Sequence, residues 1–218
     1  MVDMALLAYL ETFLTAERKE RFLEVLNLRT KFLTVVMEDV YQLHNTSAVL
    51  RSCEVFGIQE LHLIENRYGD RLDKNIAMGA EKWVDLRRYD DAVSCIKKLK
   101  SEGYRIVATS PDKSGKLVDN LTVDKPMALF FGTEKDGLTK NVFKKADDLI
   151  RIPMLGFTES LNISVAVAII LQQLSQRLRD SEVPWHLSEE EILEKRLDWA
   201  KKSIKSCDQI INRYYQKL

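Results

Sequence analysis

The sequence predicts an α/β fold built on a mostly parallel sheet, and two observations indicate it. Short apolar runs of four to six residues alternate with amphipathic segments between residue 32 and about residue 180. Runs without a polar alternation are typical of strands that helices cover on both faces. The chain has 218 residues, which is enough for one such domain with helical extensions at both ends.

A helical arm over residues 1–31 is the first predicted element. Apolar side chains recur there at helical spacing in two sets. The first set is Leu6, Leu7, Leu10 and Leu14, and the second is Phe22, Val25 and Leu26. The N-terminal stretch is therefore expected to be a helical arm appended to the sheet domain.

Six apolar runs are predicted to form the sheet, with helices between them. The runs are Phe32–Met37, Leu61–Ile64, Trp83–Leu86, Tyr104–Thr109, Met127–Phe131 and Leu149–Ile152. Each predicted helix opens with a residue that favours the N-cap position. These helices are Asn45–Phe56, Asp90–Glu102 and Thr139–Ala146. Gly103 suits the C-terminal cap of the second helix.

The last part of the chain is predicted to be helical. A long apolar helix begins at Ser160 or Asn162 and continues through Leu178. After a break, Ser188 and the glutamates that follow it form a capping box, which opens a final helix to about Tyr215. The predicted organisation is thus an N-terminal arm (1–31), one α/β domain (32–180) and a C-terminal helical extension (181–218).

Charge and cysteine content exclude several classes of protein. Lys plus Arg (33) balance Asp plus Glu (33), so the net charge does not mark a nucleic-acid partner, although the C-terminal end is locally basic. The three cysteines are widely spaced, which favours reduced thiols over a metal site or disulfides. No apolar segment approaches the roughly 20 residues that a membrane span needs. A soluble, cytoplasmic protein without a membrane partner or a metal is expected.

Three unusual polar stretches follow predicted strands. Asn45 and Arg51 follow the first strand, Gly132 and Glu134 follow the fifth, and the loop 153–160 follows the sixth. Because parallel sheets bind ligands at the carboxyl ends of their strands, the stretches predict one composite site. Each residue taken alone has a plainer interpretation. Asn45 and Asn162 would be N-caps, and Arg51 and Glu134 would be surface residues.

Two nucleotide-binding motifs are missing from the polar stretches. Leu138 follows Gly137 where a phosphate-binding loop has the Gly-Lys pair, and no GxGxxG sequence follows a predicted strand. The unpaired backbone groups of the loop 153–160 instead suit a planar heterocycle with polar edges.

The three stretches together resemble the SpoU (TrmH) family of RNA ribose 2'-O-methyltransferases, in the SPOUT superfamily. The motifs occur in order as Asn45-xx-Ala-xx-Arg51, Phe131-Gly-Thr-Glu-xx-Gly-Leu138 and Ile152-Pro-Met-xx-Gly-xxx-Ser-Leu-Asn-xx-Val-Ala166. The resemblance in spacing extends from about residue 17 to residue 179. It implies an α/β fold with a deep C-terminal trefoil knot, a homodimer, and S-adenosylmethionine as the cofactor.

The resemblance also implies roles for individual residues. The side chains important for catalysis would be Arg51, Asn45, Glu134, Ser160 and Asn162. The cofactor would be held largely by main-chain groups around Thr109, Gly132, Ile152 and Leu161. The family has been described with the arginine as general base, but a guanidinium group stays protonated, so we expect Arg51 to bind a substrate phosphate.

RNA is the implied substrate, and not DNA, because the acceptor is a ribose 2'-hydroxyl. The short extensions resemble tRNA enzymes that methylate the D-loop guanosine, guanosine 18. Ribosomal RNA, the tRNA anticodon loop and a non-catalytic RNA-binding role are the alternatives; a nucleotide-binding oxidoreductase is disfavoured because GxGxxG is missing. The candidate phosphate contacts are Arg18, Lys19, Lys201, Lys202 and Lys205. Solvated helix faces are the plainer interpretation of these charges.

Overall fold

The computed structural model describes residues 2–40, 42–65, 73–133 and 135–216. The chain divides into two compact units. The larger unit is Thr30–Trp185, and the smaller one combines Met1–Arg29 with His186–Leu218. None of the helices in the described ranges is both long enough and apolar enough to cross a bilayer.

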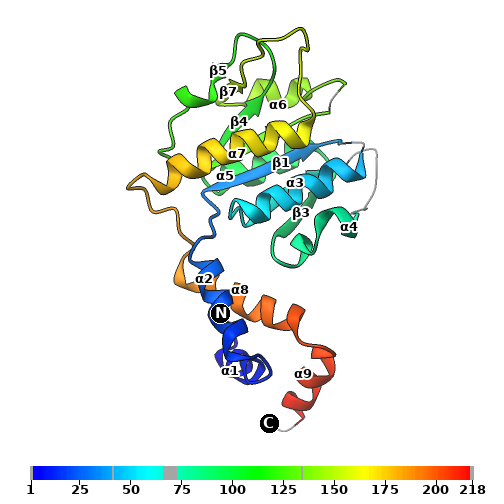
Figure 1. The fold of residues 1–218 in the computed structure, drawn as a ribbon, viewed down its shortest axis with the longest axis vertical. Helices are drawn as coiled ribbons and strands as arrows, with labels where there is room; N and C mark the ends of the chain where they lie inside the picture. Colours follow the sequence, from blue (N-terminus) through cyan, green and yellow to red (C-terminus); the bar gives the residue numbers. More distant parts are fainter. Residues whose placement is uncertain (1, 41, 66–72, 134, 217–218) are drawn as a thin grey trace. The chain divides into compact units, whose positions relative to one another are not determined.

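The larger unit contains a parallel sheet, which confirms the predicted α/β class (Figure 1). In the described ranges the strands lie in the order β3-β2-β1-β6-β4-β7-β5, and each neighbouring pair is parallel. The strands are β1 Leu33–Glu38, β2 Glu60–Ile64, β3 Asp85–Tyr89, β4 Arg105–Thr109, β5 Lys116–Leu117, β6 Met127–Phe131 and β7 Asp148–Arg151. Their carboxyl ends therefore all lie along one edge.

Helices cover both faces of the sheet. Because side chains alternate along a strand, Val35 and Leu129 pack in one core cluster and Val36 and Phe130 in another. The first cluster includes α3 (Leu43–Val55), α4 (Lys74–Ala77) and α7 (Ile163–Arg179), and the second includes α5 (Ala92–Ser101) and α6 (Lys140–Lys145). Figure 1 shows α3 and α7 side by side on one face.

Two predicted boundaries in this unit are wrong. The third predicted strand begins at Asp85, because Trp83 follows the 3-10 helix η1 (Ala80–Lys82) and donates its N–H back to Ala80. Helix α3 begins at Leu43 with Gln42 as its N-cap, two residues before the predicted start. Asn45 is therefore in the first helical turn and buried, with 2% of its surface exposed.

Other predicted helix ends agree with the structure within one residue. The N-cap of α5 is Asp91, one residue after the predicted Asp90, and its side chain accepts a hydrogen bond from the Ser94 N–H. Gly103 has the positive φ of +85° that a C-terminal cap needs. Asn162 is the N-cap of α7. The residues at these positions thus set helix boundaries that lie within one residue of the predicted ones.

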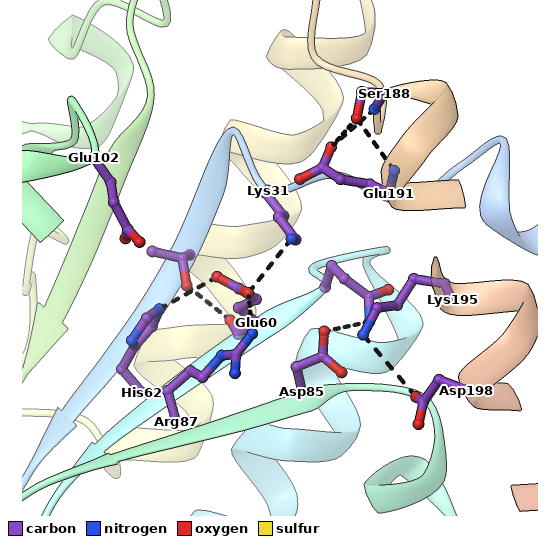
Figure 2. A network of polar contacts seen from close by, with 12 residues as sticks. Lys31, Glu60, His62, Asp85, Arg87, Glu102, Ser188, Glu191, Lys195 and Asp198 are labelled. Atoms are coloured by element: carbon purple, nitrogen blue, oxygen red, sulfur yellow. Dashed lines mark hydrogen bonds and ion pairs between the residues drawn. The ribbon is translucent and has the colours of Figure 1, made fainter. Parts of the chain in front are cut away.

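The smaller unit is helical, with α1 (Met4–Glu11), α2 (Ala16–Leu26), α8 (Glu189–Ser203) and α9 (Cys207–Tyr215). The predicted capping box at the start of α8 is present, with Ser188 and Glu191 bonded reciprocally (Figure 2). The prediction of a single final helix is wrong. The chain forms two helices, α8 and α9, and between them Ile204 is extended and Ser206 has a left-handed φ of +56°.

A polar network lies along β2 and β3 and begins at Glu60, the first residue of β2. Glu60 is buried at the start of β2 and is 3.3 Å from an Arg87 nitrogen, 3.6 Å from Lys31 Nζ and 3.8 Å from His62 Nε2 (Figure 2). His62 is also buried, and its Nδ1 is 3.2 Å from the Tyr89 hydroxyl. One carboxylate thus faces three nitrogen-bearing side chains.

Candidate functional site

A cavity of about 440 Å³ lies where β4, β6 and β7 end, against the first turns of α7. Its walls combine the strand ends, the loops after β4, β6 and β7, and residues of α6 and α7. The lining includes Thr109, Phe131, Gly132, Gly137, Ile150, Ile152, Ser160, Leu161, Ile163 and Ala166. Backbone N–H and C=O groups of the loops are thus set beside apolar side chains, as in sites for small organic ligands.

The structure brings together the four residues that were predicted to hold a cofactor. Thr109 ends β4, Gly132 follows β6, Ile152 follows β7, and Leu161 precedes α7. All four line the cavity, and so does Ser160. They come together because parallel strands place their carboxyl ends, and the loops after them, along one edge.

The loop after β6 is closed by a pair of backbone hydrogen bonds. Thr133 N–H donates to the Gly137 carbonyl (3.1 Å), and Gly137 N–H donates to the Thr133 carbonyl (3.0 Å). Gly132 permits this approach, because a Cβ atom there would lie 2.1 Å from the Gly137 carbonyl carbon. Gly137 has a φ of +68°, which glycine adopts without strain. Glu134, which the sequence predicted to be catalytic, lies outside the described residues.

Asn45 and Asn162 are joined although they belong to different motifs. The Asn162 Nδ2 donates to the Asn45 Oδ1 at 3.1 Å, and the Asn162 Oδ1 caps α7 by accepting from the Ser164 N–H at 2.9 Å. The Asn45 amide also donates to the Gln42 Oε1 at 3.1 Å. Asn162 is therefore both the predicted cap and a link between the starts of α7 and α3.

Arg51 is exposed on α3, on the same helix as Asn45. The described residues that line the cavity include neither of these two nor Asn162. The predicted catalytic residues thus form two groups in the structure, with Ser160 at the cavity wall and Asn45, Arg51 and Asn162 on α3 and at the cap of α7.

The predicted RNA-binding residues all belong to the smaller unit. Arg18, Lys201, Lys202 and Lys205 are exposed, and Lys19 is half-buried. Lys202 also pairs with Asp198 at 2.7 Å. These side chains are available to solvent within their own unit.

Sequence reasoning missed several residues of the cavity. Ser110 and Arg151 lie directly at strand ends, a position that could have marked them, and Arg151 Nε donates to the Gly115 carbonyl at 3.0 Å. Phe143 lines the cavity from α6. Its sequence context is only an amphipathic helix, which gives no sign of a ligand.

Comparison with known proteins identifies the family. The model of the SpoU rRNA Methylase family matches residues 32–172. The chain belongs to this family. A tRNA (guanosine(18)-2'-O)-methyltransferase of Borreliella burgdorferi is 43% identical over 203 residues, which is 93% of each chain. An enzyme of the same name from Thermus thermophilus is 36% identical over 190 residues, 86% of this chain and 98% of the relative.

A solved SpoU structure shares the fold. The crystal structure of the Aquifex aeolicus TrmH/SpoU tRNA modifying enzyme superposes with a TM-score of 0.78 at 34% identity. The match covers 87% of this chain and 98% of that one. It therefore extends beyond the SpoU-matched residues 32–172.

Proposed function

We propose that the chain transfers a methyl group from S-adenosylmethionine to the ribose 2'-oxygen of guanosine 18 in tRNA. The observation that carries this proposal is the cavity at the strand ends, which gathers residues of two family motifs and Thr109 at the end of β4. Relatives named for this reaction match nearly the whole chain. A tRNA substrate is favoured because the names of those relatives specify tRNA, although the description of the family model names rRNA.

The cavity fits the cofactor in size and chemistry. Its volume of about 440 Å³ lies in the range of roughly 300–1,000 Å³ for small-molecule sites. Backbone groups near Gly132, Ile152 and Leu161 would bind the polar edges of the adenosine, while Phe131 and Ile163 cover apolar surface. The bound cofactor supplies an electrophilic methyl group on a sulfonium, and the protein supplies position and electrostatics.

The motif side chains are proposed to position the RNA. Arg51 would bind a phosphate of the substrate through its planar fork and stabilise the developing alkoxide. It is not assigned as a general base, because guanidinium stays protonated. Asn45 and Asn162, through their 3.1 Å bond, would keep the helix that carries Arg51 in register with α7. Glu134 and Ser160 are proposed to complete the site.

Replacing the arginine fork by a point charge tests the role of Arg51. In Arg51→Lys the charge is kept and the bidentate geometry is lost. We expect lower turnover and weaker RNA binding, with unchanged binding of S-adenosylhomocysteine. Normal turnover and RNA affinity in this variant would remove Arg51 from the mechanism.

The terminal extensions (1–31 and 181–218) are proposed to bind tRNA, and residues 32–180 are proposed to form the methyltransferase domain. Exposed Lys201 and Lys205, together with Lys202, Arg18 and Lys19, would contact phosphates. Replacing Lys201, Lys202 and Lys205 by glutamine should flatten the salt dependence of tRNA binding, because fewer counterions are released. The charge-matched control replaces Lys97, Lys98 and Lys100 of α5, and an equal effect of both triple variants would contradict the assignment.

Three further properties come from the family resemblance. We propose that the cofactor cavity belongs to a C-terminal trefoil knot, that the chain acts as a homodimer, and that it acts on RNA and not on DNA. A cytoplasmic location is proposed from the three widely spaced cysteines, which favour reduced thiols. Sedimentation of the purified protein with and without tRNA tests the dimer.

Methyl transfer itself provides the decisive experiment. An unmodified tRNA transcript is incubated with labelled S-adenosylmethionine, beside the same transcript with 2'-deoxyguanosine at position 18. We expect transfer to the first transcript and none to the second. Equal labelling of both transcripts would move the target to another nucleotide, such as one in the anticodon loop, and labelling of ribosomal RNA alone would overturn the tRNA assignment.

A further inference from the structure

Glu38 is a buried carboxylate at the carboxyl end of β1, with 2% of its surface exposed. Its Oε2 accepts from the Thr139 backbone N–H at 2.8 Å, and its Oε1 accepts from the Thr139 hydroxyl at 2.7 Å. The two residues are 101 positions apart in the chain. Because burying a carboxylate is costly unless it is hydrogen-bonded, this double contact accounts for a charge-bearing group in the interior.

Thr139 is the N-cap of α6 but does not cap it in the usual way. An N-cap side chain normally accepts a hydrogen bond from its own helix. Thr139 makes no such bond, and its hydroxyl donates to Glu38 instead. The Glu38 carboxylate also places its acceptors at the amino end of the helix, where negative charge is favourable. The start of α6 is thus fixed by a residue of β1.

The same carboxylate lies beside both ends of the loop that lines the cavity. In the β1–β6 pairing, Met37 lies opposite Phe131, so Glu38 stands next to Gly132, where the loop leaves the sheet. Thr139 is where the loop ends and α6 begins. Between these ends, the described residues that line the cavity are Gly132, Thr133, Lys135, Asp136 and Gly137.

We propose that Glu38 is a positioning residue for the cofactor. By holding Thr139, it keeps in place the hydrogen-bonded pair Thr133 and Gly137 of the loop after β6. Glu38 is not among the residues that line the cavity, so it acts through Thr139 and not by contact. The inference rests on the proposed function, because it takes S-adenosylmethionine as the ligand of the cavity. It assigns to the site a residue outside the three motifs.

Binding of S-adenosylhomocysteine, measured by calorimetry, tests the proposal. Glu38→Gln removes the charge and one acceptor, and Thr139→Val removes the hydroxyl while keeping the side-chain shape. Each variant should weaken binding by about tenfold, as expected when a hydrogen bond to a charged group is lost. The double variant should lose less than the product of the two, because one contact is shared.

A matched control separates positioning from general stability. Thr34 is a buried residue of the same strand, and its hydroxyl donates to the Glu60 carbonyl at 2.8 Å, near the other end of β1. Thr34→Val should lower the melting temperature and leave the affinity for S-adenosylhomocysteine unchanged. In turnover, Glu38→Gln should raise the KM for S-adenosylmethionine while kcat at saturation and the KM for tRNA are kept.

Two outcomes would overturn the inference. One is a Glu38→Gln protein that binds S-adenosylhomocysteine like the wild type, and the other is independent, multiplicative losses in the double variant. Failure of the proposed function is distinguishable, because the wild type itself would then not bind this ligand. In that case, hydrogen exchange at the Thr133 and Gly137 amides still tests whether Glu38 holds the loop after β6. Faster exchange in Glu38→Gln than in Thr34→Val supports this role, and equal rates refute it.

Discussion

Acidification should destabilise the protein through His62. This side chain is 2% exposed, and its ring stacks on Tyr89 with the centroids 5.7 Å apart. Burial lowers the pKa of His62 from 6.5 to about 4. Glu60 and Glu102 act in the opposite direction and Arg87 in the same one, but desolvation is the largest cause. The 3.8 Å approach to Glu60 therefore does not make His62 a charged partner at neutral pH.

The sign and size follow from proton linkage. Below about pH 6.5 the unfolded chain binds a proton at His62, whereas the native protein stays neutral there until about pH 4. The contribution of His62 to the free energy of unfolding is therefore fully present above pH 6.5 and is lost as the pH falls toward 4. A pKa lowered from 6.5 to about 4 corresponds to about 3 kcal/mol. That is a large part of the roughly 5–15 kcal/mol that stabilises a typical domain.

Urea unfolding of the wild type and His62→Gln between pH 7 and pH 4 provides the assay. The free energy of unfolding of the wild type, minus that of the variant, should shrink by about 3 kcal/mol over this range. Acidic groups common to both proteins cancel in the difference. Thr34→Val, which removes no titrating group, should differ from the wild type by the same amount at each pH. A difference for His62→Gln that is also constant would refute the reasoning.

Three further predictions concern a loop, a cap and a thiol. Gly132→Ala places a Cβ 2.1 Å from the Gly137 carbonyl carbon, so the loop must open and calorimetry should show little S-adenosylhomocysteine binding; near-normal affinity would contradict the geometry. Ser188→Ala removes the capping box and should cost about 1 kcal/mol in urea unfolding, whereas an unchanged midpoint would count against it. Burial is the main cause that raises the pKa of Cys95 to about 12. Maleimide at pH 8 should therefore label this thiol only after denaturation, as measured by peptide mass spectrometry. Rapid labelling of the native protein would disprove this.

The sheet was largely predictable, because strands buried on both faces must be apolar throughout. The predicted runs ending at Phe131 and Ile64 coincide with β6 and β2 within one residue at each end. The prediction was wrong for β3, where Trp83 and Val84 are apolar but pack beside the short helix η1. Strand β5 has only two residues, too few for any periodic signal.

The site was predictable as a location but not as a set of contacts. Its position at a strand end placed Gly132 at this edge of the sheet, and the family resemblance added Ile152; both line the cavity. The contact between Asn45 and Asn162 was not predictable. Asn45 was taken for a helix cap, and its bond to Asn162 depends on the order of the strands in the sheet. Glu38 carried no signal for the same reason, since its contact with Thr139 arises only when β1 lies beside β6.

The bond between Asn45 and Asn162 spans 117 positions of the chain, which has a consequence for synthesis. Ribosomes add about 5–20 residues per second, so roughly 6–23 s separate the appearance of the two asparagines. During that interval β1 and α3 have emerged, but the loop and helix that complete the site have not. Long-range parallel pairing is also slow to form. Under the proposed function, a nascent chain therefore cannot methylate RNA while this region is still being translated, because the site is complete only after α7 has packed against α3.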